Sequence, residues 1–143
     1  MTLHKLVIHT DIFLDYLLHR NGTESVLRKA TASHFCYTTV FNAIELFSLA
    51  RNERERRLIE NALSAMKILG LSAKSAKKHG RWVANGMRLP RMNALIAGLC
   101  LESGLPILTG QPNEFRGVKG LVIMPVSKLS DGEVRALSGG RPV

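Results

Sequence analysis

Polar side chains that could do chemistry follow directly on a short apolar segment near the start of the chain. His9, Thr10 and Asp11 come after the run from Leu3 to Ile8. Asp11 stands where the first turn of a helix would begin, so its carboxylate could cap exposed backbone N–H groups as well as act in a site. The sequence leaves both interpretations open for Asp11.

Glu45 is the acid whose surroundings are most informative. In the segment TVFNAIELFSLA it stands four residues from both Phe41 and Leu49, which places it on the border of an apolar helix face. A carboxylate in that position needs solvent in a crevice, a cationic partner or a metal ion. Glu45 is therefore either a functional acid or an interfacial acid paired with Lys or Arg.

A third group of polar residues lies in the second half of the chain. Asn93 precedes the apolar run that begins at Ala94, and this position suits an N-cap as well as a site residue. Thr109, Gln111 and Glu114 follow the apolar segment LPILT. Taken singly, Gln111 and Glu114 would be ordinary loop residues.

The elements that must position these residues alternate between strands and helices. The pattern predicts strands at 3–8, 34–40, 67–71, 105–109 and 120–126, and helices at 11–19, 23–32, 39–50, 52–66, 73–85 and 93–103. Such alternation implies an α/β fold with a mainly parallel sheet covered on both faces. In these sheets the ligand crevice lies beyond the carboxyl ends of the strands, where the candidate residues fall.

The charge of the chain favours an acidic partner. Lys and Arg number 20 against 11 Asp and Glu, a formal net charge of +9, and nucleic acid is the commonest partner of such a chain. An anionic membrane surface or an acidic protein would fit the same number. Lys74, Lys77, Lys78 and Arg81 form one helical stripe and Arg91 leads to Asn93, so we expect RNA phosphates to follow this track; a solvated helix face is the alternative.

The remaining composition is that of one globular domain. We expect a domain over residues 1–129, followed by a short helix and a flexible tail over 130–143. Cys36 and Cys100 each stand in an apolar run, which predicts free buried thiols and a cytoplasmic protein. The longest apolar stretch, 94–101, is far too short to cross a membrane.

The order of these motifs resembles that of the PIN domain, and in particular of the VapC-type ribonuclease toxins. The resemblance covers about residues 3–126. It rests on the strand ending in Thr, the helix with an isolated Glu, and the motifs Asn-Ala-Leu-Ile-Ala, Gly-Leu-Pro-Ile-Leu-Thr-Gly-x-x-x-x-Phe and Gly-Leu-x-Ile. It implies a PIN-like fold with a sheet of about five strands flanked by helices.

The resemblance also implies a chemistry. PIN nucleases hold Mg²⁺ or Mn²⁺ with several acids and cut RNA, because hard divalent ions prefer anionic oxygens and activate water. The family positions imply metal-ligand roles for His9, Asp11, Glu45, Asn93 and Gln111, catalytic roles for Asp11, Glu45, Asn93 and Glu114, and supporting roles for Thr10 and Thr109. Two of the most characteristic acid positions hold the neutral residues His9 and Asn93, and this loss of two anions predicts weak or absent metal binding.

Two functions follow as expectations. The first is a metal-dependent endoribonuclease that is weakened or inactive in this form. The alternative is a non-catalytic PIN module that binds RNA or an antitoxin. The resemblance further implies an antitoxin partner and a homodimer.

Overall fold

A five-stranded sheet forms the centre of the molecule. The computed structural model describes residues 4–18, 25–84 and 89–129. The strands are β1 (His4–Ile8), β2 (His34–Thr39), β3 (Lys67–Leu69), β4 (Ile107–Thr109) and β5 (Ile123–Pro125). Their order is β3-β2-β1-β4-β5 and every pairing is parallel. The expected α/β fold is confirmed.

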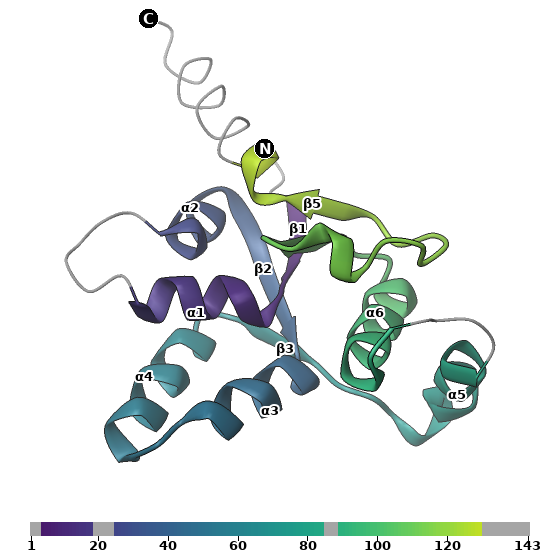
Figure 1. The fold of residues 1–143 in the computed structure, drawn as a ribbon, viewed down its shortest axis with the longest axis horizontal. Helices are drawn as coiled ribbons and strands as arrows, with labels where there is room; N and C mark the ends of the chain where they lie inside the picture. The colour runs from purple at the N-terminus through teal and green to yellow at the C-terminus, as the bar shows by residue number, and fades with distance from the viewer. Residues whose placement is uncertain (1–3, 19–24, 85–88, 130–143) are drawn as a thin grey trace, which may run out of the picture.

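Helices cover both faces of the sheet (Figure 1). They are α1 (Thr10–Leu18), α2 (Val26–Ser33), α3 (Val40–Leu49), α4 (Glu53–Leu63), α5 (Ala76–Ala84), which follows the 3₁₀ turn η1 (Ala73–Ser75), and α6 (Arg91–Ser103). A further 3₁₀ turn, η2 (Pro112–Glu114), follows β4. In the view of Figure 1, α1 to α4 lie on one side of the sheet and α5 and α6 on the other.

The central strand β1 shows why both faces are covered. Leu6 and Ile8 pack in the core beneath α1 to α4, whereas Val7, which points the opposite way, packs against Ile96 of α6. All three β1 side chains are fully buried. Alternate residues of a strand face opposite sides, so the part of β1 that is buried on both faces must be apolar, whereas its first two residues are exposed.

The outer helix α5 is attached to α6 through a histidine. His79 of α5 is buried and lies over Gly98 of α6, where a Cβ atom added to the glycine would come within 2.6 Å of His79 Nδ1. His79 Nε2 lies 3.3 Å from Glu102 Oε2, and the ring meets that of Trp82 edge-on at 5.0 Å. A glycine at position 98 is what allows the two helices to approach this closely.

The cysteines and the helix lengths agree with the expectations from sequence. Cys36 and Cys100 are both free and buried, as expected. No helix in the described ranges is both long enough and apolar enough to cross a bilayer. The expected helix and tail over 130–143 lie outside the described residues.

Candidate functional site

Chain segments that are distant in sequence meet at the carboxyl ends of β1 and β4. β1 leads through His9 into the first turn of α1, and β4 ends at Thr109. The first turns of α3 and α6 flank this point (Figure 1). His9, Thr10, Thr109 and Asn93 are all buried here. We call this region the crevice.

A chain of hydrogen bonds connects His9 with Glu45. Asn42 Nδ2 donates to His9 Nδ1 at 3.1 Å and to Thr10 Oγ1 at 2.8 Å. Thr10 Oγ1 in turn donates to Glu45 Oε1 at 2.6 Å. The isolated acid of α3 therefore accepts a hydrogen bond from a neutral hydroxyl group; a Lys or Arg partner was one of the alternatives that the sequence left open.

The orientation of the Asn42 amide fixes the protonation of His9. Asn42 Oδ1 accepts from Thr39 Oγ1 at 2.7 Å and from the Thr39 backbone N–H at 3.4 Å, so the NH₂ group must face His9. His9 Nδ1 then accepts a hydrogen bond and carries no proton. Burial lowers the pKa of His9, and the charges of Asp11, Glu45 and Glu114 oppose this only in part. His9 is therefore a neutral ring in the middle of three carboxylates.

Asp11 joins the start of α1 to the loop after β4. Its Oδ2 accepts from the Gly110 backbone N–H at 2.7 Å and from Thr109 Oγ1 at 3.1 Å. Its Oδ1 is shielded from solvent and has no hydrogen-bond partner within the described chain. Asp11 lies in the first turn of α1, as expected, but the hydrogen bonds of its carboxylate go to the loop after β4 and not to backbone N–H groups of its own helix.

Asn93 pairs with Glu114. Helix α6 begins at Arg91 with Pro90 as N-cap, so Asn93 lies inside the first turn and its capping interpretation is wrong. Asn93 Nδ2 donates to Glu114 Oε2 at 3.1 Å. The loop that carries Glu114 is also fixed by Phe115, which is fully buried and meets the His9 ring edge-on at 4.9 Å.

These contacts do not suit a Mg²⁺ or Mn²⁺ site. The shielded Asp11 Oδ1 is the single observation that favours a cation. Within the described ranges, however, no three His, Cys, Asp or Glu side chains are grouped so that they could hold one ion. Glu45 and Glu114 each take a neutral protein donor, and His9 offers nitrogen, which suits hard ions poorly.

The other expected site residues lie at the rim or outside the crevice. Gln111 is exposed, and its backbone N–H donates to Thr109 Oγ1 at 3.0 Å. Arg91 is exposed on the first turn of α6. The exposed stripe lies on η1 and α5 and consists of Lys74, Lys77, Lys78 and Arg81. Helix α5 packs chiefly against α6 and η1.

Asn42 is the residue that sequence reasoning missed. It is fully buried and contacts Thr39, His9 and Thr10. Thr39 and Asn42 form a capping box at the start of α3, with Asn42 N donating to Thr39 Oγ1 at 3.1 Å. The spacing Thr-x-x-Asn at a strand–helix junction was the available signal.

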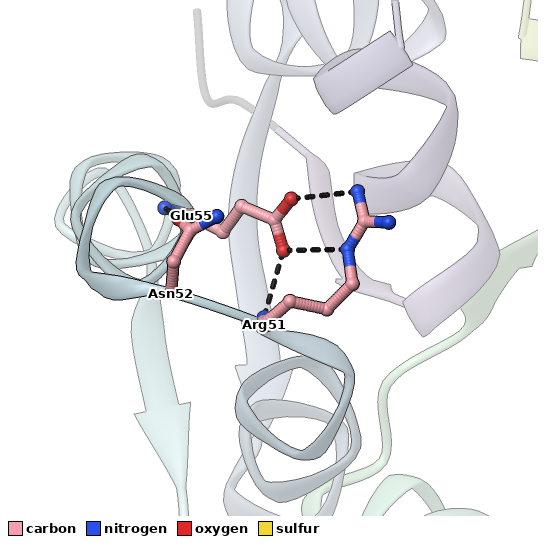
Figure 2. Close-up of polar contacts among 3 residues, drawn as sticks. All are labelled: Arg51, Asn52 and Glu55. Atoms are coloured by element: carbon pink, nitrogen blue, oxygen red, sulfur yellow. Dashed lines mark hydrogen bonds and ion pairs between the residues drawn. The ribbon is translucent and has the colours of Figure 1, made fainter.

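An apolar groove lies away from the crevice, between α1, α3 and α4. Its volume is about 290 Å³, and it is lined chiefly by leucines: Leu14, Leu17, Leu18, Leu46, Leu49 and Leu58. Arg51 and Glu55 stand at its border, where Glu55 accepts from the Arg51 backbone N–H and from the guanidinium at 2.9 Å (Figure 2). Asn52 caps α4 by accepting from Glu55 N, which fixes the turn between the two helices.

Comparison with known proteins supports the fold assignment. No protein-family model matches the sequence. No match is found among curated proteins either. Solved structures do match. VapBC2 from Rickettsia felis bound to a promoter DNA fragment is 17% identical, with 85% of this chain and 98% of that chain covered and a TM-score of 0.69. DNA-bound VapBC from Salmonella typhimurium is 18% identical, with 87% of this chain and 99% of that chain covered and a TM-score of 0.70.

A third match is VapBC-5 from Mycobacterium tuberculosis, a member of the VapBC family of toxin–antitoxin systems. It is 19% identical, with 85% of this chain and 98% of that chain covered and a TM-score of 0.57. At these identities the likeness establishes the fold. The PIN-like fold expected from the sequence is confirmed.

Proposed function

We propose that this chain is a toxin-type PIN module that works by binding an antitoxin-type protein and RNA, and that it cleaves RNA weakly or not at all. The observation that carries the proposal is the contact between Asn93 and Glu114 at 3.1 Å. In the family pattern, position 93 is an acid that would share a metal with its neighbours. Here it is an amide that donates to the neighbouring acid without a metal.

Hydrogen bonds also take the place of a metal ion on the other side of the crevice. The Asn42 amide holds His9 and Thr10, and the Thr10 hydroxyl holds Glu45. Several carboxylates in one crevice repel one another unless cations or hydrogen-bond donors stabilise them. Neutral hydrogen-bond donors therefore stabilise these carboxylates in place of an ion. This supports the expectation that the chain binds Mg²⁺ or Mn²⁺ only weakly.

The groove between α1, α3 and α4 supports the antitoxin part of the proposal. Leu18, Leu49 and Leu58 are 76%, 55% and 42% exposed, and leucines exposed together along one groove mark an interaction surface. An amphipathic helix that lays apolar residues into a groove is a recurrent way to cover such a surface. The fold neighbours are two-protein toxin–antitoxin complexes, so we assign the groove to a helical segment of such a partner.

Calorimetry tests the antitoxin assignment. The partner is the product of the neighbouring gene, if that gene encodes a small DNA-binding protein, and the quantity measured is the Kd of its complex with this chain. Leu58→Glu places a charge in the groove and should weaken the complex at least tenfold. Val122→Glu is the matched control, because Val122 is 64% exposed and lies before β5. Equal affinities of the two variants would overturn the groove assignment.

RNA binding is supported by a second observation, the exposed stripe on η1 and α5. All four of its cationic side chains are exposed, and the chain carries a net charge of +9. Such charge binds phosphate without reading sequence.

A homodimer, expected from the resemblance, remains part of this proposal. Ile44 of α3 is 50% exposed, and Phe47, one turn further along the same helix, is 37% exposed. Light scattering of the isolated chain tests the oligomeric state. A mass of one chain at micromolar concentration would contradict a stable dimer.

A further inference from the structure

Two histidines stand side by side at the end of the sheet opposite the crevice. His4 begins β1 and His34 begins β2, and the two are register partners in the parallel pair. Figure 1 shows the two strands running side by side toward α1 and α3. Register partners on neighbouring strands project to the same face, and the ring centroids here are 6.3 Å apart.

Ser33 contacts the ring of His34. Ser33 Oγ donates to the Lys29 carbonyl oxygen at 2.9 Å and lies 2.8 Å from His34 Nδ1. In the tautomer that carries its proton on Nδ1, His34 donates to Ser33 Oγ and has a lone pair on Nε2 for a ligand.

Space for a ligand lies beside the two rings. The two rings border a hollow of about 570 Å³ that is also lined by Pro106 and Met124. None of the described residues that line this hollow has a carboxylate; besides the imidazole nitrogens, its side chains carry the thioether sulfur of Met124 and the amino group of Lys5.

We propose that His4 and His34 form a binding site for a borderline divalent transition-metal ion, of the class of Zn²⁺, Ni²⁺ or Cu²⁺. Imidazole suits these ions and suits Mg²⁺ poorly. An ion about 2.0–2.1 Å from one nitrogen of each ring holds the two centroids roughly 5–6.5 Å apart, which agrees with the observed spacing. Ser33 is the positioning residue, because a ligand histidine that donates its other N–H is fixed in tautomer and orientation.

The site is open and distinct from the crevice. Two protein ligands leave the remaining coordination positions to water in the hollow, so binding is weaker than in a four-ligand structural site. His9, the histidine of the crevice, follows the opposite end of β1. The inference therefore goes beyond the proposed function and does not depend on it.

Titration calorimetry of the untagged chain with NiCl₂ and ZnCl₂ tests the proposal. His34→Gln and His4→Gln should each weaken Ni²⁺ and Zn²⁺ binding at least tenfold, and excess MgCl₂ should not compete. His79→Gln is the matched control, since it removes a histidine of α5 that packs against α6 and should leave the affinity unchanged. Ser33→Ala should weaken binding by about tenfold or more through loss of the Nδ1 acceptor.

Two results would overturn the proposal. The first is unaltered chain that binds neither ion at submillimolar concentration. The second is binding that is lost in His79→Gln and retained in His4→Gln. His4 is exposed, so His4→Gln should fold normally and keeps the test valid if His34→Gln does not.

Discussion

Asn42 donates a hydrogen bond to His9 across 3.1 Å, joining the start of α3 to the end of β1. The contact requires a neutral His9, because a proton on Nδ1 would face the NH₂ group of Asn42. Neutral donors therefore hold the crevice together. This arrangement, the packing of α5 and the exposed stripe each lead to measurable consequences.

Loss of Asn42 should destabilise the fold. Asn42→Ala removes a fully buried side chain and leaves His9 Nδ1 and the Thr39 hydroxyl without their partner. Unpaired buried polar groups should lower the free energy of unfolding by about 2–3 kcal/mol. Urea unfolding measures the change. Asn61→Ala, at an exposed position of α4, is the control and should change the free energy by less than about 0.5 kcal/mol.

Acid should destabilise the protein through His9. Burial lowers the pKa of folded His9, while the unfolded chain takes up the proton at about pH 6.5. Below that pH the unfolded state binds more protons, so the free energy of unfolding should fall as the pH drops.

The variant His9→Asn keeps an acceptor for Asn42 and has no titrating ring. Its free energy of unfolding should fall less than that of the unaltered chain between about pH 7.5 and 5.5 in urea unfolding. His34 has a lowered pKa as well, so some pH dependence should remain. An identical fall in both proteins would contradict the account of His9.

Position 98 should not tolerate a side chain. Gly98→Ala places a Cβ within 2.6 Å of buried His79 Nδ1 and forces α5 away from α6, which should cost about 1–3 kcal/mol. Gly80→Ala is the matched control: Gly80 is inside α5, nothing lies within 4 Å of its added Cβ, and the change should stabilise by about 0.5–1 kcal/mol. Thermal unfolding of the two variants should therefore shift in opposite directions.

The stripe on α5 should bind RNA through phosphates. Lys77→Gln with Lys78→Gln should weaken binding of a short single-stranded RNA and reduce the slope of log affinity against log salt by about 1 for each lysine. Fluorescence anisotropy at several salt concentrations measures both quantities. Arg54→Gln with Arg57→Gln removes the same charge from exposed positions of α4. If both double variants lose equal affinity, the binding reflects net charge and the stripe has no specific role.

Much of the fold could be predicted because parallel strands buried on both faces are apolar throughout. β1 and β4 stood out for this reason, and the alternation with helices implied the parallel sheet that is observed. Ends of elements were harder. Asn93 resembles an N-cap in sequence, but α6 starts at Arg91 after Pro90 and places Asn93 inside the helix. Proline at the cap position decided this boundary.

The site could be predicted in position and only partly in its contacts. The end of β1 and Glu45 were found because polar residues at strand ends and acids on apolar faces are conspicuous. Asn42 was missed because its partners, His9 and Thr10, are more than thirty residues away, and its spacing to Thr39 has a local explanation as a capping box. The link from Asp11 to Gly110 likewise depends on the β1–β4 pairing, which local sequence does not reveal.

The most direct test of the central claim is RNA cleavage, measured side by side with Mn²⁺ and with EDTA for three proteins: the unaltered chain, Asn93→Asp, and the double variant His9→Asp with Asn93→Asp. The account predicts weak or no Mn²⁺-dependent cleavage by the unaltered chain and much faster cleavage by the double variant, where two carboxylates are restored beside Glu45 and Glu114. Mn²⁺-dependent cleavage by the unaltered chain that is as fast as that of the double variant, and that Glu45→Ala abolishes, would contradict it.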